Sequence, residues 1–188
     1  MKRIEELERE YVLDVLDGQF KTSQGAVYMT RFEKAFSEKF ESKFSISHVN
    51  GTATMHSVLE ASGIGLGDEV IVPPLTMSAT SLAVLHANAT PIFADIDIDT
   101  FVIDAKSIEE KITERTKAII TVALYGLSPD MDPIMDMAKK YNLVVIEDNA
   151  EAFLSYYKGR LVGTLGHAAS FSFQSSKHLT AGEGGIIT

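Results

Sequence analysis

The stretch Leu143-Val-Val-Ile-Glu-Asp148 joins four consecutive apolar residues to two carboxylates. A continuous apolar run indicates a strand buried on both faces, because a strand with one face in water would alternate apolar and polar residues. Sheets buried on both faces are typically parallel and covered by helices. The stretch therefore predicts an α/β fold, and it places Glu147 and Asp148 at the carboxyl end of a buried strand.

On both sides of this stretch the chain alternates between strand-like and helix-like segments. Apolar residues at helical spacing predict helices, and short apolar runs bounded by turn residues predict strands. The predicted helices are 4–16, 29–40, 51–62, 78–88, 107–112 and 133–141. The predicted strands are 45–49, 69–72, 91–94, 118–124, 143–146 and 169–173. This order favours a parallel sheet with helices on both faces, and no linker or internal repeat divides it.

The composition excludes several classes of protein. Of 188 residues, 45% are hydrophobic and 23% are charged, which is typical of globular proteins. The net charge of −9 argues against nucleic-acid binding, which needs clustered Lys and Arg. No apolar run is long enough to span a membrane, and the charged start is unlike a signal peptide, so we expect a cytoplasmic location. The absence of cysteine excludes thiolate metal ligands, and we assign no metal site.

Ligands of open α/β sheets bind beyond the carboxyl ends of the strands, so the residues that follow the predicted strands are candidates for a site. Asn50-Gly51-Thr52-Ala53 follows strand 45–49 and opens a helix. A glycine and the free amides of a helix N-terminus can bind a phosphate. An ordinary helix cap is the more common interpretation of such a turn when it stands alone.

Two further strand ends carry side chains of interest. Asp148 could hold a protonated ring nitrogen of a cofactor through a charge-assisted hydrogen bond, or it could cap the next segment. Lys177 follows the alternating stretch Ser170-Phe-Ser-Phe173, and Gly182-Glu-Gly-Gly185 comes soon after it. A lysine in a polar loop is usually a solvated surface group, whereas an amine at a strand exit also suits attack on a carbonyl. The residues alone leave both interpretations open.

Taken in order, these three segments resemble the DegT/DnrJ/EryC1/StrS family, the sugar aminotransferases of pyridoxal-phosphate (PLP) fold type I. The resemblance runs from about Tyr11 to Thr188 and includes segments between the candidate sites. These are Gly67-Asp-Glu-Val-Ile-Val-Pro73, Ala94-Asp-Ile-Asp97, Thr116-Lys-Ala-Ile-Ile120, Tyr125-Gly126, Asp130-Met-Asp132, Glu147-Asp-Asn-Ala150, Tyr157-Lys-Gly-Arg160 and Gly163-Thr-Leu-Gly166.

The resemblance implies a three-layer α/β/α fold with a mostly parallel sheet. It implies an N-terminal helical arm in residues 1–30 and an incomplete PLP-binding large domain in residues 31–188. Family members are roughly twice as long, so a C-terminal small domain, with substrate contacts and part of the dimer interface, is expected to be missing. The family's active site lies between two subunits, which implies a homodimer with shared active sites.

The resemblance also implies roles for individual residues. Lys177 would form the Schiff base with PLP and then carry a proton between cofactor and substrate, and Asp148 would pair with the pyridinium nitrogen. Ser172 would bind the cofactor phosphate together with backbone amides of the first helical turn. Those amides are the ones of Gly51, Thr52 and Ala53.

Three positions depart from the commonest family pattern. Met77 stands where an aromatic usually stacks on the PLP ring, and a thioether can also lie against a ring face. Glu151, near the ring hydroxyl, stands where many members carry glutamine, although some perosamine-synthase-like members carry an acid. His167 stands where aspartate is common, and a turn residue without chemical role is an equally good interpretation.

The implied function is transfer of an amino group from glutamate to a nucleotide-linked keto-deoxysugar, for cell-surface polysaccharide or secondary-metabolite synthesis. Sugar 3-dehydratases of the same family carry histidine in place of the lysine, whereas here Lys177 is followed by His178. A PLP-binding but non-catalytic or regulatory member is another alternative. A dinucleotide-binding domain ranks low, because Asn50-Gly51-Thr52-Ala53 has one glycine and not the pattern Gly-x-Gly-x-x-Gly.

We expect residues 1–188 to fold as a large-domain portion that binds PLP but transaminates poorly or not at all, because half of the family's length is missing. Formation of 2-oxoglutarate from glutamate, in the presence of a ketosugar nucleotide, measures this. A robust aminotransferase rate from this chain alone would contradict the expectation.

Overall fold

The computed structural model describes residues 4–18 and 26–188, which form a seven-stranded sheet between two layers of helices. The strand order is β1-β9-β8-β5-β4-β2-β3. Pairing is parallel from β8 to β3, and β9 runs antiparallel to both of its neighbours. The strands are β1 (Ile46–His48), β2 (Glu69–Val72), β3 (Thr90–Phe93), β4 (Thr116–Val122), β5 (Val144–Asp148), β8 (Ala168–Ser172) and β9 (Gly185–Ile187).

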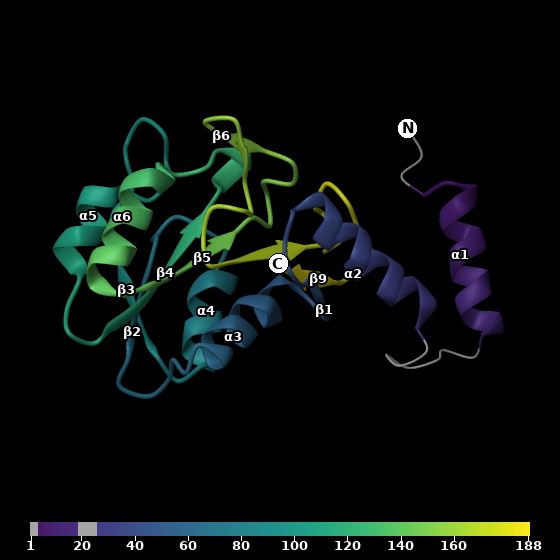
Figure 1. Ribbon diagram of the computed structural model, residues 1–188, viewed down its shortest axis with the longest axis horizontal. Coiled ribbons are helices and arrows are strands. Elements are labelled where there is room, and N and C mark those ends of the chain that lie inside the picture. The colour runs from purple at the N-terminus through teal and green to yellow at the C-terminus, as the bar shows by residue number, and fades with distance from the viewer. Residues whose placement is uncertain (1–3, 19–25) are drawn as a thin grey trace.

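Alternating side chains of the central strands pack against opposite helix layers. Val70 and Val72 of β2 join a buried cluster with α3 (Gly51–Ala61) and α4 (Ala79–His86). Ile71, between them, joins another cluster with α5 (Ala105–Lys111) and α6 (Met131–Tyr141). Figure 1 shows the two pairs of helices on either side of the sheet. The predicted three-layer α/β/α fold with a mostly parallel sheet is confirmed.

Helix α2 (Val27–Lys39) covers β8 and β9 through aromatic side chains. The ring centroids of Phe36 and Phe40 lie 5.1 and 4.6 Å from that of Phe171 in β8. Aromatic rings are stabilised at such separations by more than the burial of area. The cluster fixes the strand that ends in Ser172.

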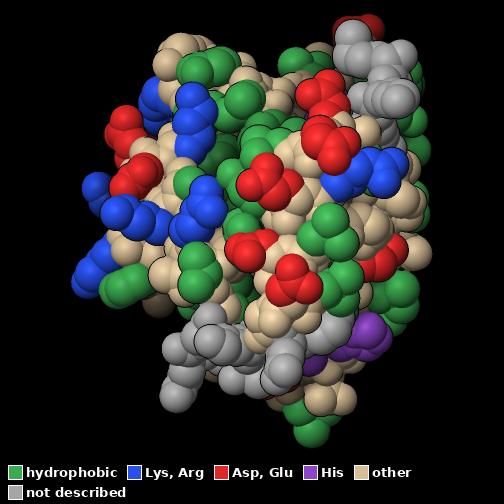
Figure 2. All heavy atoms as spheres, turned by 90° about the vertical axis from the view of Figure 1, so that its right-hand side faces the viewer, with side chains coloured by type: hydrophobic (Ala, Val, Ile, Leu, Met, Phe, Trp, Pro, Cys, Tyr) green, Lys and Arg blue, Asp and Glu red, His purple; other side chains and the backbone are tan. Residues whose placement is uncertain are grey.

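Helix α1 (Glu6–Asp17) lies beyond α2 at the end of the molecule (Figure 1). Tyr28 joins the two helices, because its hydroxyl donates to the carboxylate of Asp14 at 2.7 Å. Leu7, Val12, Leu13 and Leu16 are exposed along α1. Figure 2 looks at this side of the molecule, where hydrophobic side chains lie among charged ones.

The predicted arm at residues 1–30 stays a prediction. Its boundary falls inside α2, which runs continuously from residue 27 to residue 39. Residues 1–3 and 19–25 of the arm lie outside the described residues. None of the helices in residues 4–18 and 26–188 is long and apolar enough to cross a membrane.

The predicted strand 118–124 ends two residues too late. Leu124 opens the short 3-10 helix η1 (Leu124–Gly126), and the backbone of Tyr125 turns into the left-handed region with φ 51°. The hairpin of β6 (Tyr156–Tyr157) and β7 (Arg160–Leu161) was not among the predicted strands. Each of its strands has only two residues, too few for a periodic pattern.

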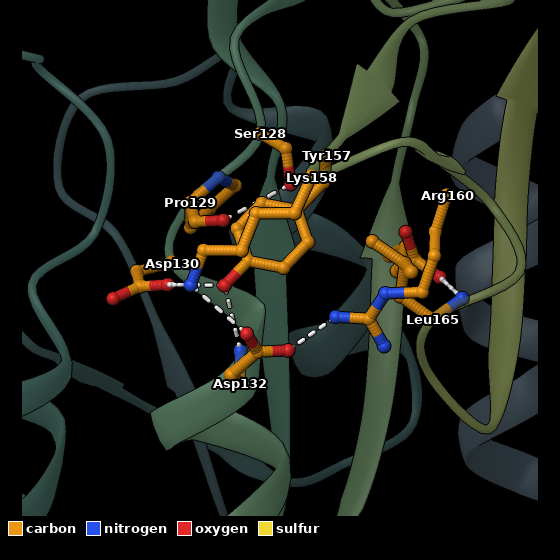
Figure 3. Close-up of polar contacts among 9 residues, drawn as sticks. Ser128, Pro129, Asp130, Asp132, Tyr157, Lys158, Arg160 and Leu165 are labelled. Atoms are coloured by element: carbon orange, nitrogen blue, oxygen red, sulfur yellow. Dashed lines mark hydrogen bonds and ion pairs between the residues drawn. The ribbon is translucent and has the colours of Figure 1, made fainter.

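Charged side chains clip this hairpin to the start of α6 (Figure 3). Nζ of Lys158 lies 3.1 Å from Oδ1 of Asp130 and 2.9 Å from Oδ2 of Asp132. The hydroxyl of Tyr157 donates to Asp130, and Arg160 pairs with Asp132. The backbone amide of Asp132 donates in turn to the Tyr157 hydroxyl at 3.2 Å. The clip joins the segment after η1 to the segment after β5.

We expect Asp132→Asn to flatten the loss of stability in acid. The hydrogen bond from Lys158 is the largest of the effects that lower the pKa of Asp132 from 3.8 to about 2. A lowered pKa in the folded state means that the carboxylate stabilises the fold above pH 3.8, and that this is lost as pH falls toward about 2. Thermal melts across that range measure the effect, with Asp136→Asn on the same helix as the control. Parallel pH profiles for Asp132→Asn and the unmodified chain would contradict it.

Candidate active site

A cavity of about 400 Å³ opens where β4, β5 and β8 end. Its volume is in the range of small-molecule sites. Seven of the eight predicted cofactor-binding residues line it, namely Gly51, Thr52, Met77, Asp148, Glu151, Ser172 and Lys177. The topology thus brings together residues from widely separated parts of the chain, although their roles remain predictions.

The eighth residue, Ala53, is not among the residues that line the cavity. Its backbone amide donates to Oδ1 of Asn50 at 2.8 Å, so Asn50 caps the helix. This hydrogen bond uses the amide that was expected to help bind a phosphate. The amides of Gly51 and Thr52 in the first turn have no acceptor within the helix and can face an anion. The turn therefore serves as a helix cap and still offers two amides to a ligand.

Close packing holds the start of α3 against β8. A Cβ atom on Gly51 would lie 3.1 Å from Cβ of Ser172, so the glycine lets the helix approach the serine. Behind this contact, Oγ1 of Thr54 and Oγ of Ser170 lie 2.5 Å apart in a buried hydrogen bond. The Thr54 hydroxyl also contacts the carbonyl oxygen of Gly51. These contacts place the Ser172 hydroxyl beside the helix N-terminus.

Asp148 is 5% exposed and lies at the end of β5 on the α4 side of the sheet. Its Oδ2 accepts a hydrogen bond from the Thr80 hydroxyl at 3.0 Å, and its Oδ1 accepts one from the amide of Ala150 at 3.2 Å. Burial raises the pKa of Asp148, while these hydrogen bonds and the charge of Lys177 act in the opposite direction. Asp148 is thus a buried carboxylate that reaches the cavity.

Glu147, the neighbouring carboxylate, has a separate role because adjacent strand residues point to opposite faces. Its oxygens accept hydrogen bonds from the amides of Gly163, Leu165 and Gly166 at 2.7–2.8 Å. Burial raises the pKa of Glu147, and these three donors oppose that effect. Glu147 secures the loop before β8 and does not line the cavity.

The Lys177 side chain is 16% exposed, so it is not a solvated surface group. Its Nζ lies 3.4 Å from Oε1 of Glu151, whose other oxygen accepts a hydrogen bond from the amide of Tyr125 at 3.1 Å. Burial of the amine inside the cavity favours the interpretation that it is a reactive lysine. His178 lies in a neighbouring hollow that Tyr125, Glu151 and Lys177 also line.

Three other residues complete this description. Met77 is 66% exposed at the cavity. Nδ1 of His167 accepts a hydrogen bond from the amide of Val145 at 2.9 Å, near the start of β5 and β8, which supports a structural role.

Thr80 was not predicted, because a threonine inside an apolar helix carries no motif. Its contact with Asp148 becomes visible only when α4 is packed on the sheet.

Comparison with known proteins identifies the family. A sequence profile of the DegT/DnrJ/EryC1/StrS aminotransferase family matches residues 2–188. The chain belongs to this family. The earlier resemblance is thereby confirmed.

Named relatives and solved structures agree with this assignment. GDP-perosamine synthase of Caulobacter vibrioides is 48% identical over 99% of this chain and 50% of its own length. The X-ray structure of an aminotransferase from Psychrobacter cryohalolentis is 41% identical, with a TM-score of 0.95 over 98% of this chain and 47% of that one. A Streptococcus pneumoniae protein solved in a PLP form is 32% identical, with a TM-score of 0.89 over 98% of this chain and 50% of that one. The chain spans about half the length of the curated relatives it matches.

The glycine pair Gly184-Gly185 allows a test of how the start of α3 is positioned. A Cβ atom on Gly185 would lie 2.5 Å from the backbone carbonyl of Asn50, whereas one on Gly184 would make ordinary contacts. We expect Gly185→Ala to displace the helix start and to lower stability by about 1–3 kcal/mol, as overpacking does. Thermal melts and titration with inorganic phosphate measure both effects, and Gly184→Ala is the matched control. Equal behaviour of the two variants would show that the close approach is unimportant.

Proposed function

We propose that the chain is the cofactor-binding half of a PLP-dependent aminotransferase that acts on nucleotide-linked keto-deoxysugars with glutamate as amino donor. One observation carries this proposal: the Lys177 amine and the Asp148 carboxylate line a single cavity together with Ser172 and the N-terminus of α3. An amine, a buried acid and an anion-binding turn are the three kinds of group that PLP needs.

The residues present fit PLP at each of its reactive or charged parts. Ser172 and the amides of Gly51 and Thr52 suit the phosphate, because a helix N-terminus favours an anion. Asp148 suits the ring nitrogen, because a buried carboxylate forms a strong charge-assisted hydrogen bond with a protonated nitrogen. Lys177 suits the aldehyde, because an amine is the nucleophile that carbonyl chemistry uses. Met77 supplies an apolar surface for a ring face.

When bound, PLP supplies an electron sink for negative charge that develops on a substrate carbon. The protein's part is to hold and move protons around that sink. Asp148 keeps the proton on the ring nitrogen, since an ionised acceptor stabilises the charged ring. Nζ of Lys177 accepts and returns the proton at the reacting carbon. Glu151 lies within 3.4 Å of Nζ and helps to orient the amine.

The substrate class is supported by the relatives. A 48% identical protein is named GDP-perosamine synthase, which makes a nucleotide-linked sugar the best supported acceptor for this chain. Glutamate as donor, and use of the product in polysaccharide or secondary-metabolite synthesis, are part of the same proposal. The other half of the relatives' length and a second copy of the chain complete the site in this proposal. The exposed apolar residues of α1 support such a homodimer.

Lysine chemistry favours transamination over the alternatives. The dehydratase interpretation requires histidine at the position of the reactive amine, and it is Lys177 that lines the cavity beside Asp148. His178 lines the neighbouring hollow and is not among the residues that line the cavity with Asp148. A non-catalytic PLP binder is disfavoured because the amine, the buried acid and the anion-binding turn are all retained.

We expect PLP to bind covalently to Lys177. Incubation with PLP, reduction with borohydride and mass spectrometry of peptides should place one pyridoxyl group on Lys177, and Lys177→Ala should abolish it. Lys139→Ala, on the exposed surface of α6, is the control for non-specific labelling and should leave the yield unchanged. Labelling that is spread over several lysines, or retained in Lys177→Ala, would contradict the proposal.

Turnover is tested separately on a full-length protein that contains this chain. With glutamate and a panel of ketosugar nucleotides, we expect 2-oxoglutarate and an amino sugar in equal amounts. Covalent PLP without any turnover across the panel would favour the non-catalytic alternative.

A further inference from the structure

The carboxylate of Asp148 ends a chain of hydroxyl groups that extends into α4. Oγ1 of Thr80 lies 3.0 Å from Oδ2 of Asp148, and Oγ1 of Thr76 lies 3.1 Å from Oγ1 of Thr80. Thr80 is fully buried, whereas Thr76 lines the cavity. Thr80 lies in the first turn of α4, and Thr76 lies four positions earlier, in the segment before the helix.

The chemistry of the three groups fixes the direction of these hydrogen bonds. An ionised carboxylate can only accept, so the single proton of the Thr80 hydroxyl points to Asp148. The oxygen of Thr80 is then left as an acceptor for the Thr76 hydroxyl. Each hydroxyl thus donates toward the carboxylate. The hydrogen bonds in such a chain polarise and so strengthen one another.

The alternative protonation state fits the same geometry less well. A neutral Asp148 loses most of the benefit of the two donors that face it, Thr80 on Oδ2 and the Ala150 amide on Oδ1. Hydrogen bonds to a charged group contribute more to stability than bonds between neutral groups do. The surroundings of Asp148 therefore oppose the tendency of burial to neutralise it.

We propose that Thr80 is a positioning residue that holds Asp148 ionised and fixes Oδ2, so that the carboxylate meets a protonated ring nitrogen in the cavity. The inference rests on the proposed function, because it is PLP that would bring that nitrogen. Thr80 itself touches neither cofactor nor substrate in this proposal. Its contribution passes through Asp148 alone.

Two other charged groups act on Asp148 and are left unchanged in the test. The charge of Lys177 lowers the pKa of Asp148 and that of Glu151 raises it. They come from the loop after β8 and the segment after β5, whereas Thr80 comes from α4. Thr80→Val keeps the shape of the side chain and removes the hydroxyl, which is the donor to Asp148 and the acceptor for Thr76.

The test compares two ligands in binding to the chain. One is PLP, and the other is its carbocyclic analogue, in which CH replaces the ring nitrogen while the aldehyde and the phosphate remain. We expect Thr80→Val to weaken PLP about tenfold, since about 1.4 kcal/mol corresponds to a factor of ten. The analogue has no ring nitrogen for Asp148 to hold, so its affinity should stay unchanged. Thr80→Ser, which restores a hydroxyl, should recover the affinity for PLP.

Control variants separate this role from a general loss of structure. Thr121→Val replaces another buried threonine, in β4, and should leave both affinities unchanged. In an Asp148→Asn background, Thr80→Val should cause no further loss of PLP affinity, because the charge that it serves is gone. If Thr80→Val fails to fold, Thr80→Cys carries the same comparison, because a thiol is a weaker donor of similar size.

The possible outcomes are distinct. If the unmodified chain binds neither ligand, the proposed function itself fails. If it binds both, and Thr80→Val weakens them equally or weakens neither, the proposed function stands and the role of Thr80 is overturned. Selective loss of PLP affinity, recovered by Thr80→Ser, supports the proposal.

Discussion

The site depends on the register of three neighbouring parallel strands. Asp148 at the end of β5 lies beside Val122 of β4 on one side and Ser170 of β8 on the other. Ser172 follows Ser170 after one more pleat, on the same face of the sheet. Because parallel strands end at one edge, the acid and the serine reach a common cavity although they are far apart in the sequence. A shift of one residue in either pairing would turn one of them to the opposite helix layer.

A buried acid at that edge depends on groups from several segments of the chain. Burial raises the pKa of Asp148 and so favours its neutral form, whereas the charged form is the one that stabilises a positively charged ring nitrogen. The amide of Ala150, the hydroxyl of Thr80 and the charge of Lys177 all act against neutralisation. Helix α4 thus does more than cover the sheet, because Thr80 in its first turn donates a hydrogen bond to Oδ2 of Asp148.

The sequence predicts best what depends on local pattern. The strand at Glu69–Val72 was predicted with its observed bounds, and the helix from Gly51 lies within one residue of its observed end. Sequence patterns do not predict features that depend on contacts between distant segments of the chain. Thr80 gains its partner only through packing, and the hairpin after β5 depends on ion pairs between Asp132 and residues 158 and 160. The assignment of the Ala53 amide to a phosphate stays a prediction, and in the structure that amide donates to the side chain of Asn50.

The pair Glu147-Asp148 shows why neighbouring identical charges can have unrelated roles. Both carboxylates are buried at the end of one strand. Glu147 faces three backbone amides of one loop, which use both of its oxygens and leave it no access to the cavity. Asp148, on the other face, meets one amide and one hydroxyl and keeps contact with open space. Strand alternation therefore assigns one acid to stability and leaves the other available for a ligand. The same alternation places Ser170 in a buried hydroxyl pair and repeats its direction two residues later at Ser172, where the sheet ends and the cavity begins.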